Sequence, residues 1–211
     1  MGIFITFEGP DGSGKSTQIE RLAHHLQQQG KKVCCTREPG GTDIGEKIRE
    51  LLHDVKHIEM APLAEILLYS ASRAQLVQEL VQPKLANGYV VICDRYADST
   101  YAYQGHGRGL DLATLKLITK FATNALQPDL TIFLDVPVEV GLTRKQQANE
   151  AGQGEWNRMD QLTLDFHQRV REGYLALAHE NEHPWYIIDA TQTIEDTHHA
   201  ICAAVSRLQT S

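Results

Sequence analysis

Residues 9–17 read GPDGSGKST, in which two glycines five positions apart precede a lysine and two hydroxyl side chains. This order matches the pattern G-x-x-x-x-G-K-[ST], which is expected between a strand and a helix. Glycines let the backbone curl so that successive N–H groups point at phosphate oxygens, with a helix dipole behind them. The lysine adds a mobile cation near the β and γ phosphates. The stretch therefore predicts a cradle for a nucleotide such as ATP.

A magnesium site is predicted beside this cradle. Ser16 would offer its hydroxyl to Mg²⁺, and Asp94, which ends an apolar run, is placed to hold the ion through water. The alternative is that the glycines only form a helix-capping turn. The apolar run before the loop and the amphipathic segment after it favour the cradle.

Four arginines are predicted to lie in or near the loops that face the cradle: Arg37, Arg49, Arg73 and Arg95. A guanidinium group matches two phosphate oxygens at once and can neutralise charge as a phosphoryl group moves between two anions. In a chain of formal net charge -7, this concentration is selective. It predicts a second substrate that carries phosphate, with surface ion pairing to nearby glutamates as the alternative.

Composition and missing patterns narrow the class of protein. The chain has 211 residues, 42% of them hydrophobic, as expected for one globular α/β domain. The negative charge predicts that neither nucleic acid nor an anionic membrane is a partner, because both would repel it. The guanine-reading pattern N-K-x-D is absent, which disfavours a GTPase. Without a long apolar run or a signal-peptide pattern, we expect a cytoplasmic protein.

Cysteines and histidines give weaker signals. The four cysteines are Cys34, Cys35, Cys93 and Cys202, and no two of them form a C-x-x-C pair. We expect them to be buried, reduced thiols rather than zinc ligands or disulfides. Two adjacent histidine pairs are interpreted as parts of solvated helix faces, with adventitious metal binding as the alternative: His24 with His25, and His198 with His199. MGIFIT matches a myristoylation pattern, but IFITF is better explained as a core strand.

The elements that position the cradle are short apolar, β-rich runs at residues 3–7, 32–36, 89–93, 130–136 and 185–189. Segments with helical spacing lie between them, which predicts a five-stranded, doubly wound parallel sheet with helices on both faces, in a single domain, residues 1–211. Ligands of such sheets bind beyond the carboxyl ends of the strands. The cradle and three further polar segments, REPGGT, DRYADSTYAYQG and DATQT, follow four of the runs at that edge.

Five stretches in this order closely resemble bacterial-type thymidylate kinases: FEGPDGSGKST, TREPGGT, LLYSASRAQL, DRYADSTYAYQGHGRG and PDLTIFLDVP. The resemblance extends from about Ile3 to Ala178. It implies a P-loop nucleotide kinase fold with a mobile lid at about residues 144–160. It also implies transfer of a phosphoryl group from ATP to dTMP with Mg²⁺, in dTTP biosynthesis, by a homodimer.

The resemblance also implies roles for individual residues. The ATP-binding set would be Gly9, Pro10, Asp11, Gly12, Ser13, Gly14, Lys15, Ser16, Thr17 and Arg144. The dTMP-binding set would be Asp11, Pro39, Arg49, Tyr69, Arg73, Arg95, Thr100, Tyr103 and Gln104. The catalytic set would be Lys15, Arg95, Arg158 and Asp11, without a general base, because the acceptor oxygen is already anionic.

Two departures from the family pattern bear on these roles. Tyr69 stands where the family usually has a phenylalanine stacked on thymine, so its hydroxyl needs a partner. Some members carry an arginine in the cradle, where this chain has Gly12 and Ser13. The cation at the transferring phosphoryl group is therefore expected from the lid, with Arg158 as first candidate and Arg144 as second, in a segment that also holds Lys145.

Two alternatives stay open at this point. A kinase of dUMP, of a modified pyrimidine nucleotide or of a nucleoside would use the same cradle, and comparing acceptors separates these enzymes. An ATP-dependent binding or regulatory module would hold nucleotide without releasing ADP when dTMP is added. The concentration of arginines argues against that module.

Overall fold

Five parallel strands form the centre of the protein, whose computed structural model describes residues 2–152, 157–180 and 183–208. They are β1 (Ile3–Glu8), β2 (Val33–Arg37), β3 (Val90–Asp94), β4 (Leu130–Asp135) and β5 (Trp185–Asp189). They pair in the order β2-β3-β1-β4-β5. Each coincides with a predicted apolar run to within two residues. The three central strands β1, β3 and β4 are buried almost throughout, which requires a nearly continuous apolar sequence, whereas the edge strands β2 and β5 are only partly buried. The predicted α/β sheet is confirmed.

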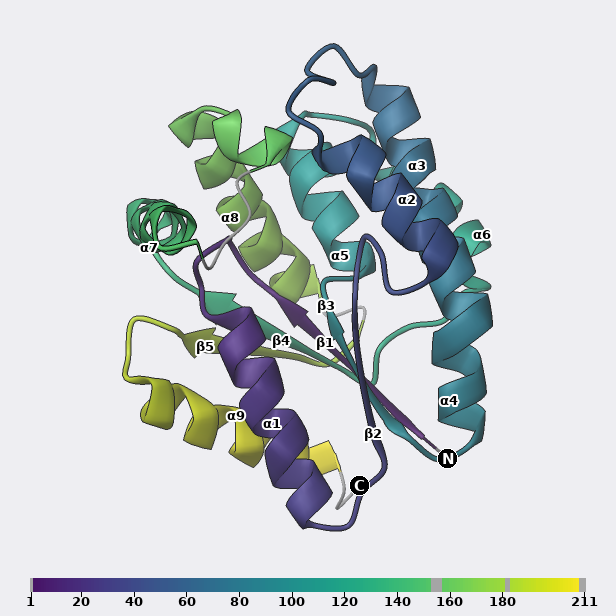
Figure 1. Ribbon diagram of the computed structural model, residues 1–211, viewed down its shortest axis with the longest axis vertical. Coiled ribbons are helices and arrows are strands. Elements are labelled where there is room, and N and C mark those ends of the chain that lie inside the picture. The colour runs from purple at the N-terminus through teal and green to yellow at the C-terminus, as the bar shows by residue number, and fades with distance from the viewer. Residues whose placement is uncertain (1, 153–156, 181–182, 209–211) are drawn as a thin grey trace.

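Helices cover both faces of this sheet (Figure 1). One face carries α1 (Lys15–Gln28) and α9 (Ile194–Leu208), which lie side by side. The other face carries a larger group of helices, and α2 (Asp43–His53) packs against the edge of this group. The members of the group are α3 (Pro62–Leu76), a π-helix (Val77–Val81), α4 (Gln82–Ala86), α5 (Ala97–Thr100), a second π-helix (Tyr101–Gly107), α6 (Leu112–Thr123) and α8 (Leu164–Glu180).

The alternation of side chains along β1 decides which groups reach each layer. Ile5 and Phe7 join the core beneath α1 and α9, whereas Phe4 belongs to the core on the opposite face. The same alternation turns Glu8 toward the face of Phe4, where its carboxylate meets the hydroxyl of Tyr174 from α8. A charged side chain at the end of a core strand is thereby brought into the interior.

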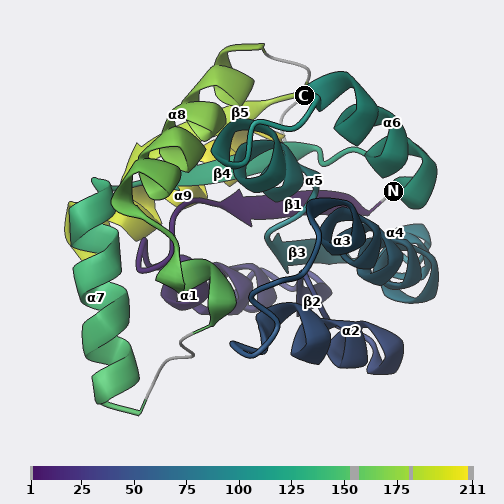
Figure 2. The same ribbon diagram turned by 90° about the horizontal axis from the view of Figure 1, so that it is seen from above.

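The predicted lid, residues 144–160, falls on three parts of the chain. The first is the C-terminal part of α7 (Val138–Glu150), which runs along the outside of the molecule (Figure 2). Residues 153–156 belong to the prediction but lie outside the described residues. Asn157 then caps a short 3-10 helix (Arg158–Gln161), accepting from the N–H of Met159. The two described parts flank the carboxyl edge of the sheet, where a lid must act.

Gly2 packs tightly against α4 and the turn that leads into β3. The N–H of Gly2 donates to the carbonyl of Leu85, and a Cβ at Gly2 would lie 2.5 Å from the carbonyl oxygen of Tyr89. This close approach explains a glycine at position 2 without lipidation. Among the described residues, no helix has the length and apolar character needed to cross a membrane.

Candidate active site

A cavity of about 450 Å³ lies beyond the carboxyl ends of β1, β2 and β3. From the cradle it is lined by Asp11, Gly12, Gly14, Lys15, Ser16 and Thr17. All the residues predicted to bind dTMP also line it: Asp11, Pro39, Arg49, Tyr69, Arg73, Arg95, Thr100, Tyr103 and Gln104. Segments from distant parts of the chain therefore meet in one cleft, as expected for a parallel sheet.

The cradle has the backbone shape that its glycines predict. Gly12 and Gly14 have φ of 75° and 89°, in the left-handed region, and Gly14 begins α1. The ammonium group of Lys15 donates to the carbonyls of Gly9 at 3.0 Å and Pro10 at 3.1 Å. Burial and the neighbouring Arg95 lower the pKa of Lys15 to about 8. The lysine therefore rests on its own loop, within reach of any phosphate that enters.

The cradle contacts the start of α7 so closely that both sides need glycine. A Cβ at Gly12 would collide with the carbonyl of Gly141, and one at Gly141 would lie 2.6 Å from the carbonyl oxygen of Asp11. One turn further along α7 follow two basic residues of the predicted lid. Arg144 donates to the carbonyl of Ala190 at 3.1 Å, beside the end of β5, and Lys145 reaches Asp11 at 3.2 Å.

The predicted magnesium ligands fit a hydrated divalent cation. Asp94 ends β3 and lines the cavity together with Ser16, whose side chain is exposed. The Oδ1 atom of Asp94 is buried without a hydrogen-bond partner among the described residues. Oxygen ligands of this kind suit Mg²⁺, which usually keeps several of its waters. A carboxylate oxygen without a partner beside a phosphate cradle is a place where such an ion compensates buried charge.

Arg73 is held by three acceptors inside the protein. Its guanidinium donates to Glu38 at 2.7 Å, to the hydroxyl of Thr100 at 3.0 Å and to the carbonyl of Tyr96 at 3.0 Å. Arg73 is 2% exposed, although it lines the cavity. A buried guanidinium needs such a set of partners, and the set fixes its fork in one orientation.

Arg95 stands between the cradle and the acceptor residues. It is a non-glycine residue with φ of 69°, a strained backbone conformation that surrounding contacts must maintain. Its guanidinium donates to Asp11 at 2.9 Å and lies 5.1 Å from the centre of the Tyr103 ring. Burial alone would raise the pKa of Asp11, but Arg95 and Lys145 outweigh it and hold that pKa well below its usual range.

Glu8 is the buried anion behind Arg95. Its carboxylate accepts from the N–H of Tyr96 at 2.8 Å, from Ser99 at 2.6 Å and from the hydroxyl of Tyr174 at 2.8 Å. Burial, together with the nearby Asp98, raises the pKa of Glu8 to about 7. The carboxyl group therefore changes its protonation near neutral pH, within the network that positions Arg95.

Glu65 of α3 gathers a second set of cations at the far end of the cavity. Its carboxylate accepts from Gln104 at 2.8 Å, from both sides of the Arg108 fork at 2.9 Å, and from Arg158 at 2.6 Å. Burial would raise the pKa of Glu65, but these donors outweigh it and lower that pKa. Arg158 is 5% exposed and does not line the cavity. The first candidate for the lid cation thus lies against Glu65.

Lys145 lies nearer to the cradle than either of the two arginines named for the lid role. It lines the cavity and bridges Asp11 of the cradle, at 3.2 Å, to Asp160 of the 3-10 helix, at 2.5 Å. Asn157 and Met159 also reach the cavity wall. The segments on both sides of residues 153–156 are therefore tied across the cleft.

The remaining acceptor residues differ in how firmly they are held. Arg49 donates to the carbonyl of Pro39 at 3.0 Å. Tyr69 lines the cavity, but its hydroxyl has no hydrogen bond among the described residues. Burial raises the pKa of Tyr69 to about 12, so the hydroxyl keeps its proton at neutral pH. The described residues therefore do not supply the hydrogen-bond partner that the sequence analysis expects for this hydroxyl.

The sequence-based set missed the anions behind the arginines: Glu8, Glu38, Glu65 and the supporting hydroxyls of Ser99 and Tyr174. Glu8 and Glu38 stand directly beside two of the motifs, in FEG and TREPGG, and that position was the available signal. Glu65 lies in an ordinary helical segment, and no local pattern marks it. Together these groups hold cations around a cleft fit for two anionic ligands, which is the arrangement that phosphoryl transfer requires.

Comparisons with known proteins agree with this geometry. The sequence profile of the Thymidylate kinase family matches residues 7–201. The thymidylate kinase of Roseiflexus castenholzii is 51% identical over 97% of this chain and 93% of its own length. That of Deinococcus radiodurans is 49% identical over 98% of this chain and 97% of its own. A crystal structure of thymidylate kinase from Ehrlichia chaffeensis has a TM-score of 0.78 and 31% identity, covering 97% of this chain and 98% of that chain.

Proposed function

Because this chain belongs to the thymidylate kinase family, it phosphorylates dTMP to dTDP with ATP in dTTP synthesis, and we propose how its residues divide that work. The cradle of residues 9–17 holds the phosphates of ATP, with Lys15 leaving its loop carbonyls to follow the transferring group. Arg49 and Arg95 hold the phosphate of dTMP, and Asp11 positions it. The observation that supports this most is the place of Arg95, in contact with both Asp11 and Tyr103.

The nucleoside of dTMP would occupy the inner end of the cavity. Arg73, Thr100 and Gln104 present hydrogen-bonding groups there, and each is already oriented by a partner, Glu38, Arg73 or Glu65. The rings of Tyr69 and Tyr103 provide faces for the base and the deoxyribose. Donors held in advance cost little ordering on binding, so this end favours one shape of nucleoside.

Catalysis by this arrangement needs positioning and charge, without a general base. Ser16 and Asp94 would hold Mg²⁺, partly through water, and the ion would neutralise charge on the transferring phosphates. Lys15 and Arg95 stabilise the donor and acceptor oxygens from opposite sides. Arg158 is proposed as the lid cation, for which it would have to leave Glu65. Arg144, beside the end of β5, is proposed to act on the ATP side.

The experiment that tests these roles is ADP release by the purified protein with Mg-ATP and one acceptor at a time. We expect strong turnover only with dTMP among dTMP, dUMP, its ribose counterpart, AMP, GMP and CMP. Arg49→Ala should raise the KM for dTMP and leave the KM for ATP near its original value. Lys47→Ala, an exposed change on the same helix, is the control. Equal rises in both KM values would contradict the assignment of Arg49 to the acceptor.

We further propose that residues 1–211 act as one catalytic domain in the cytoplasm, and that two copies form a homodimer. Exposed apolar side chains lie one turn apart on both α3 and α6, which contact each other: Leu63, Leu67, Leu117 and Phe121. A contiguous apolar surface of this kind is typical of a protein interface. Phe121 is the most exposed of the four, at 91%, so Phe121→Lys should convert a dimer to a monomer in sedimentation equilibrium. A wild-type monomer would refute the dimer.

A further inference from the structure

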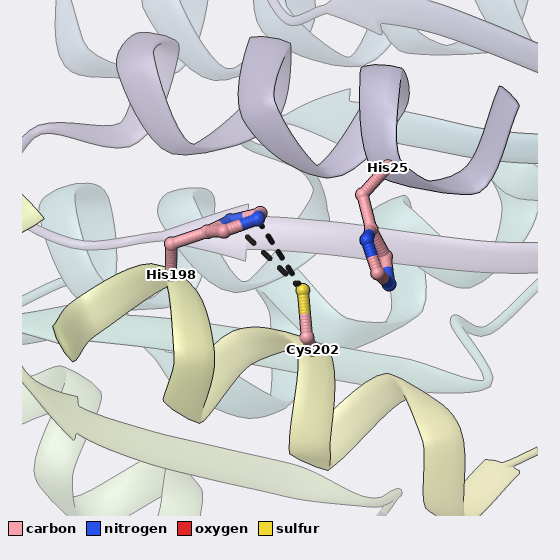
Figure 3. Close-up of side chains that lie close together, drawn as sticks. All are labelled: His25, His198 and Cys202. Carbon is pink, nitrogen blue, oxygen red and sulfur yellow. Dashed lines mark hydrogen bonds between the residues drawn. The ribbon is translucent and has the colours of Figure 1, made fainter. Parts of the chain in front are cut away.

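Three side chains meet between α1 and α9, on the sheet face opposite α3 and α8 (Figure 3). His25 comes from the last turn of α1, and His198 and Cys202 come from α9. The thiol of Cys202 lies 3.5 Å from Nε2 of His198. The rings of His25 and His198 meet edge to face with centroids 5.9 Å apart. One ligand atom from each residue lies within 4.8 Å of the other two.

The two helices hold these residues in place. His198 and Cys202 are four positions apart, so they lie on one face of α9, one turn above the other. Their helices are anchored in the core on both sides of the cluster, by Leu22 and Leu26 of α1 and by Ile201 of α9. All three side chains of the cluster are half-buried. A ligand set on rigid, packed helices is pre-positioned, and its half-burial leaves a path for an ion.

We propose that His25, His198 and Cys202 form a binding site for Zn²⁺, with water in the fourth position. Two imidazole nitrogens and a thiolate suit this borderline-soft cation, whereas the oxygen ligands of the active site suit Mg²⁺. Zinc bonds of about 2.0 to 2.3 Å bring tetrahedral ligand atoms to roughly 3.5 Å from one another. The observed separations therefore need only small side-chain rotations. This revises the sequence-based interpretation of Cys202 as a plain buried thiol.

Arg21, one turn before His25, brings a positive charge near the cluster. It forms an ion pair with Glu195 at 2.8 Å, and this carboxylate offsets part of that charge. The competing contact at His25 is the amide of Gln29, 2.9 Å from its Nε2 atom, and this contact is exposed. An exposed hydrogen bond of this kind contributes little and is readily exchanged. The adjacent His24 is exposed and contacts Gln28 instead, so the two neighbouring histidines face different environments.

The position of the site defines its role. His25 is ten residues after Lys15, which is about 15 Å along the helix axis. The ion would therefore not touch the reacting phosphates. Near the start of both helices, Gln18 donates to the carbonyl of Ile194 at 2.9 Å. Zinc would join the helices a second time, between the last turn of α1 and the middle of α9, and so fasten the C-terminal helix to the helix that follows the cradle. We infer a stabilising site, separate from turnover.

Cobalt(II) spectroscopy and zinc-dependent unfolding test this site in the full-length protein without a polyhistidine tag. Bound Co²⁺ should give tetrahedral visible bands and a thiolate charge-transfer band, and Cys202→Ser should abolish the latter. Zinc should raise the Tm of the wild type. In His25→Gln, His198→Gln and Cys202→Ser, zinc affinity should fall by more than about tenfold. Exposed residues of the same types supply matched controls with unchanged affinity: His24→Gln and His199→Gln next to two of the ligands, and Cys35→Ser on β2.

The outcomes separate a built site from chance binding. Far-ultraviolet circular dichroism and dTMP kinase activity identify the variants that are folded, and only these are compared. If wild-type protein shows no thiolate charge-transfer band with Co²⁺, the proposal is wrong. It is equally wrong if His24→Gln lowers zinc affinity as much as His25→Gln, because the ion would then sit on surface histidines. Activity that is unchanged by bound zinc would support a structural role, and activity lost in proportion to its occupancy would overturn that role.

Discussion

The two halves of the active site are built by different means. On the proposed ATP side, the cradle offers backbone N–H groups, and Lys15 rests on carbonyls of its own loop, at most six residues away. On the proposed dTMP side, guanidinium groups are held by buried carboxylates from distant parts of the chain. Arg73 is paired with Glu38, 35 residues away, and Arg158 with Glu65, 93 residues away.

This difference follows from the chemistry of each ligand. Triphosphates present many equivalent oxygens, so a curved backbone with a helix dipole recognises them without distinguishing the rest of the molecule. A particular nucleoside must be told from close relatives, which requires side chains fixed in position. Fixing a buried cation requires a buried anion, since an unpaired charge in the interior is strongly destabilising. The acceptor half therefore consists of ion pairs, and the donor half of backbone.

The largest effect should come from Lys15, the cation of the donor half that lies within the cradle itself. Lys15→Ala removes the mobile cation from the transferring phosphates, and we expect kcat to fall by about 1000-fold. The Tm should change little, because the ammonium makes no ion pair with any of the described residues. Steady-state ADP release measures the first effect and calorimetry the second. Lys31→Ala, on an exposed loop, is the control. A loss below tenfold would mean that backbone groups alone suffice on this side.

Glu8 joins the two halves, since it ends β1 directly before the cradle and supports the Arg95 network. Its pKa is raised from 4.5 to about 7 by burial and Asp98, so the folded state keeps a proton that the unfolded state loses. Stability from this group therefore falls as the pH rises from 4.5 to 7, by about 3 kcal/mol in total. Glu8→Gln removes this decline.

The measurement is urea unfolding of wild type and Glu8→Gln at several pH values. The stability of the variant should rise relative to wild type between pH 4.5 and pH 7, and the difference should be constant below pH 4.5. The glutamine keeps an oxygen for the N–H of Tyr96, so the fold is retained. A difference that is independent of pH over this range would show that Glu8 is ionised throughout.

The lid cation is the third test, because Arg158, the residue proposed for this role, and Lys145, which the structure places nearest to the cradle, belong to different halves. Arg158 is bound to Glu65 on the acceptor side, whereas Lys145 contacts Asp11 of the cradle. We expect Arg158→Ala to lower kcat by about 100-fold and Lys145→Ala by about tenfold, because a guanidinium can span two phosphoryl oxygens. Pre-steady-state phosphoryl transfer is the measurement. The reverse order would assign the role to Lys145 and leave Arg158 as a tether of Glu65.

The sequence predicts the donor half better than the acceptor half for the same physical reason. A cradle is a local structure: its glycines, lysine and helix follow one another in nine residues, so a motif contains almost all of it. The strands are also local, because each needs an apolar run. Glu8 and Tyr174 are 166 positions apart in the sequence, and no periodicity or spacing of residues predicts that they are in contact. Position in or near the loops singled out the arginines and the resemblance gave them roles, but the anions that hold them needed the fold.

Tyr69 supplies the smallest effect and the finest test of the acceptor half. Its hydroxyl lines the cavity without a protein partner among the described residues, so it gains nothing from desolvation when a base covers the ring. Tyr69→Phe should therefore lower the KM for dTMP by up to about threefold, with stability changed by less than about 1 kcal/mol. Tyr69→Leu, which removes the aromatic face, should raise that KM.

The same two variants bear on dUMP. A single methyl group in an apolar pocket is worth about 1 to 3 kcal/mol, so the preference for dTMP over dUMP should survive in Tyr69→Phe if ring packing creates it. A KM for dTMP that rises by more than tenfold in Tyr69→Phe would show that the hydroxyl bonds the substrate. Tyr69 would then belong with Arg73 and Gln104 among the residues that recognise the base through hydrogen bonds. Unlike those two residues, it would do so without a carboxylate that fixes its position.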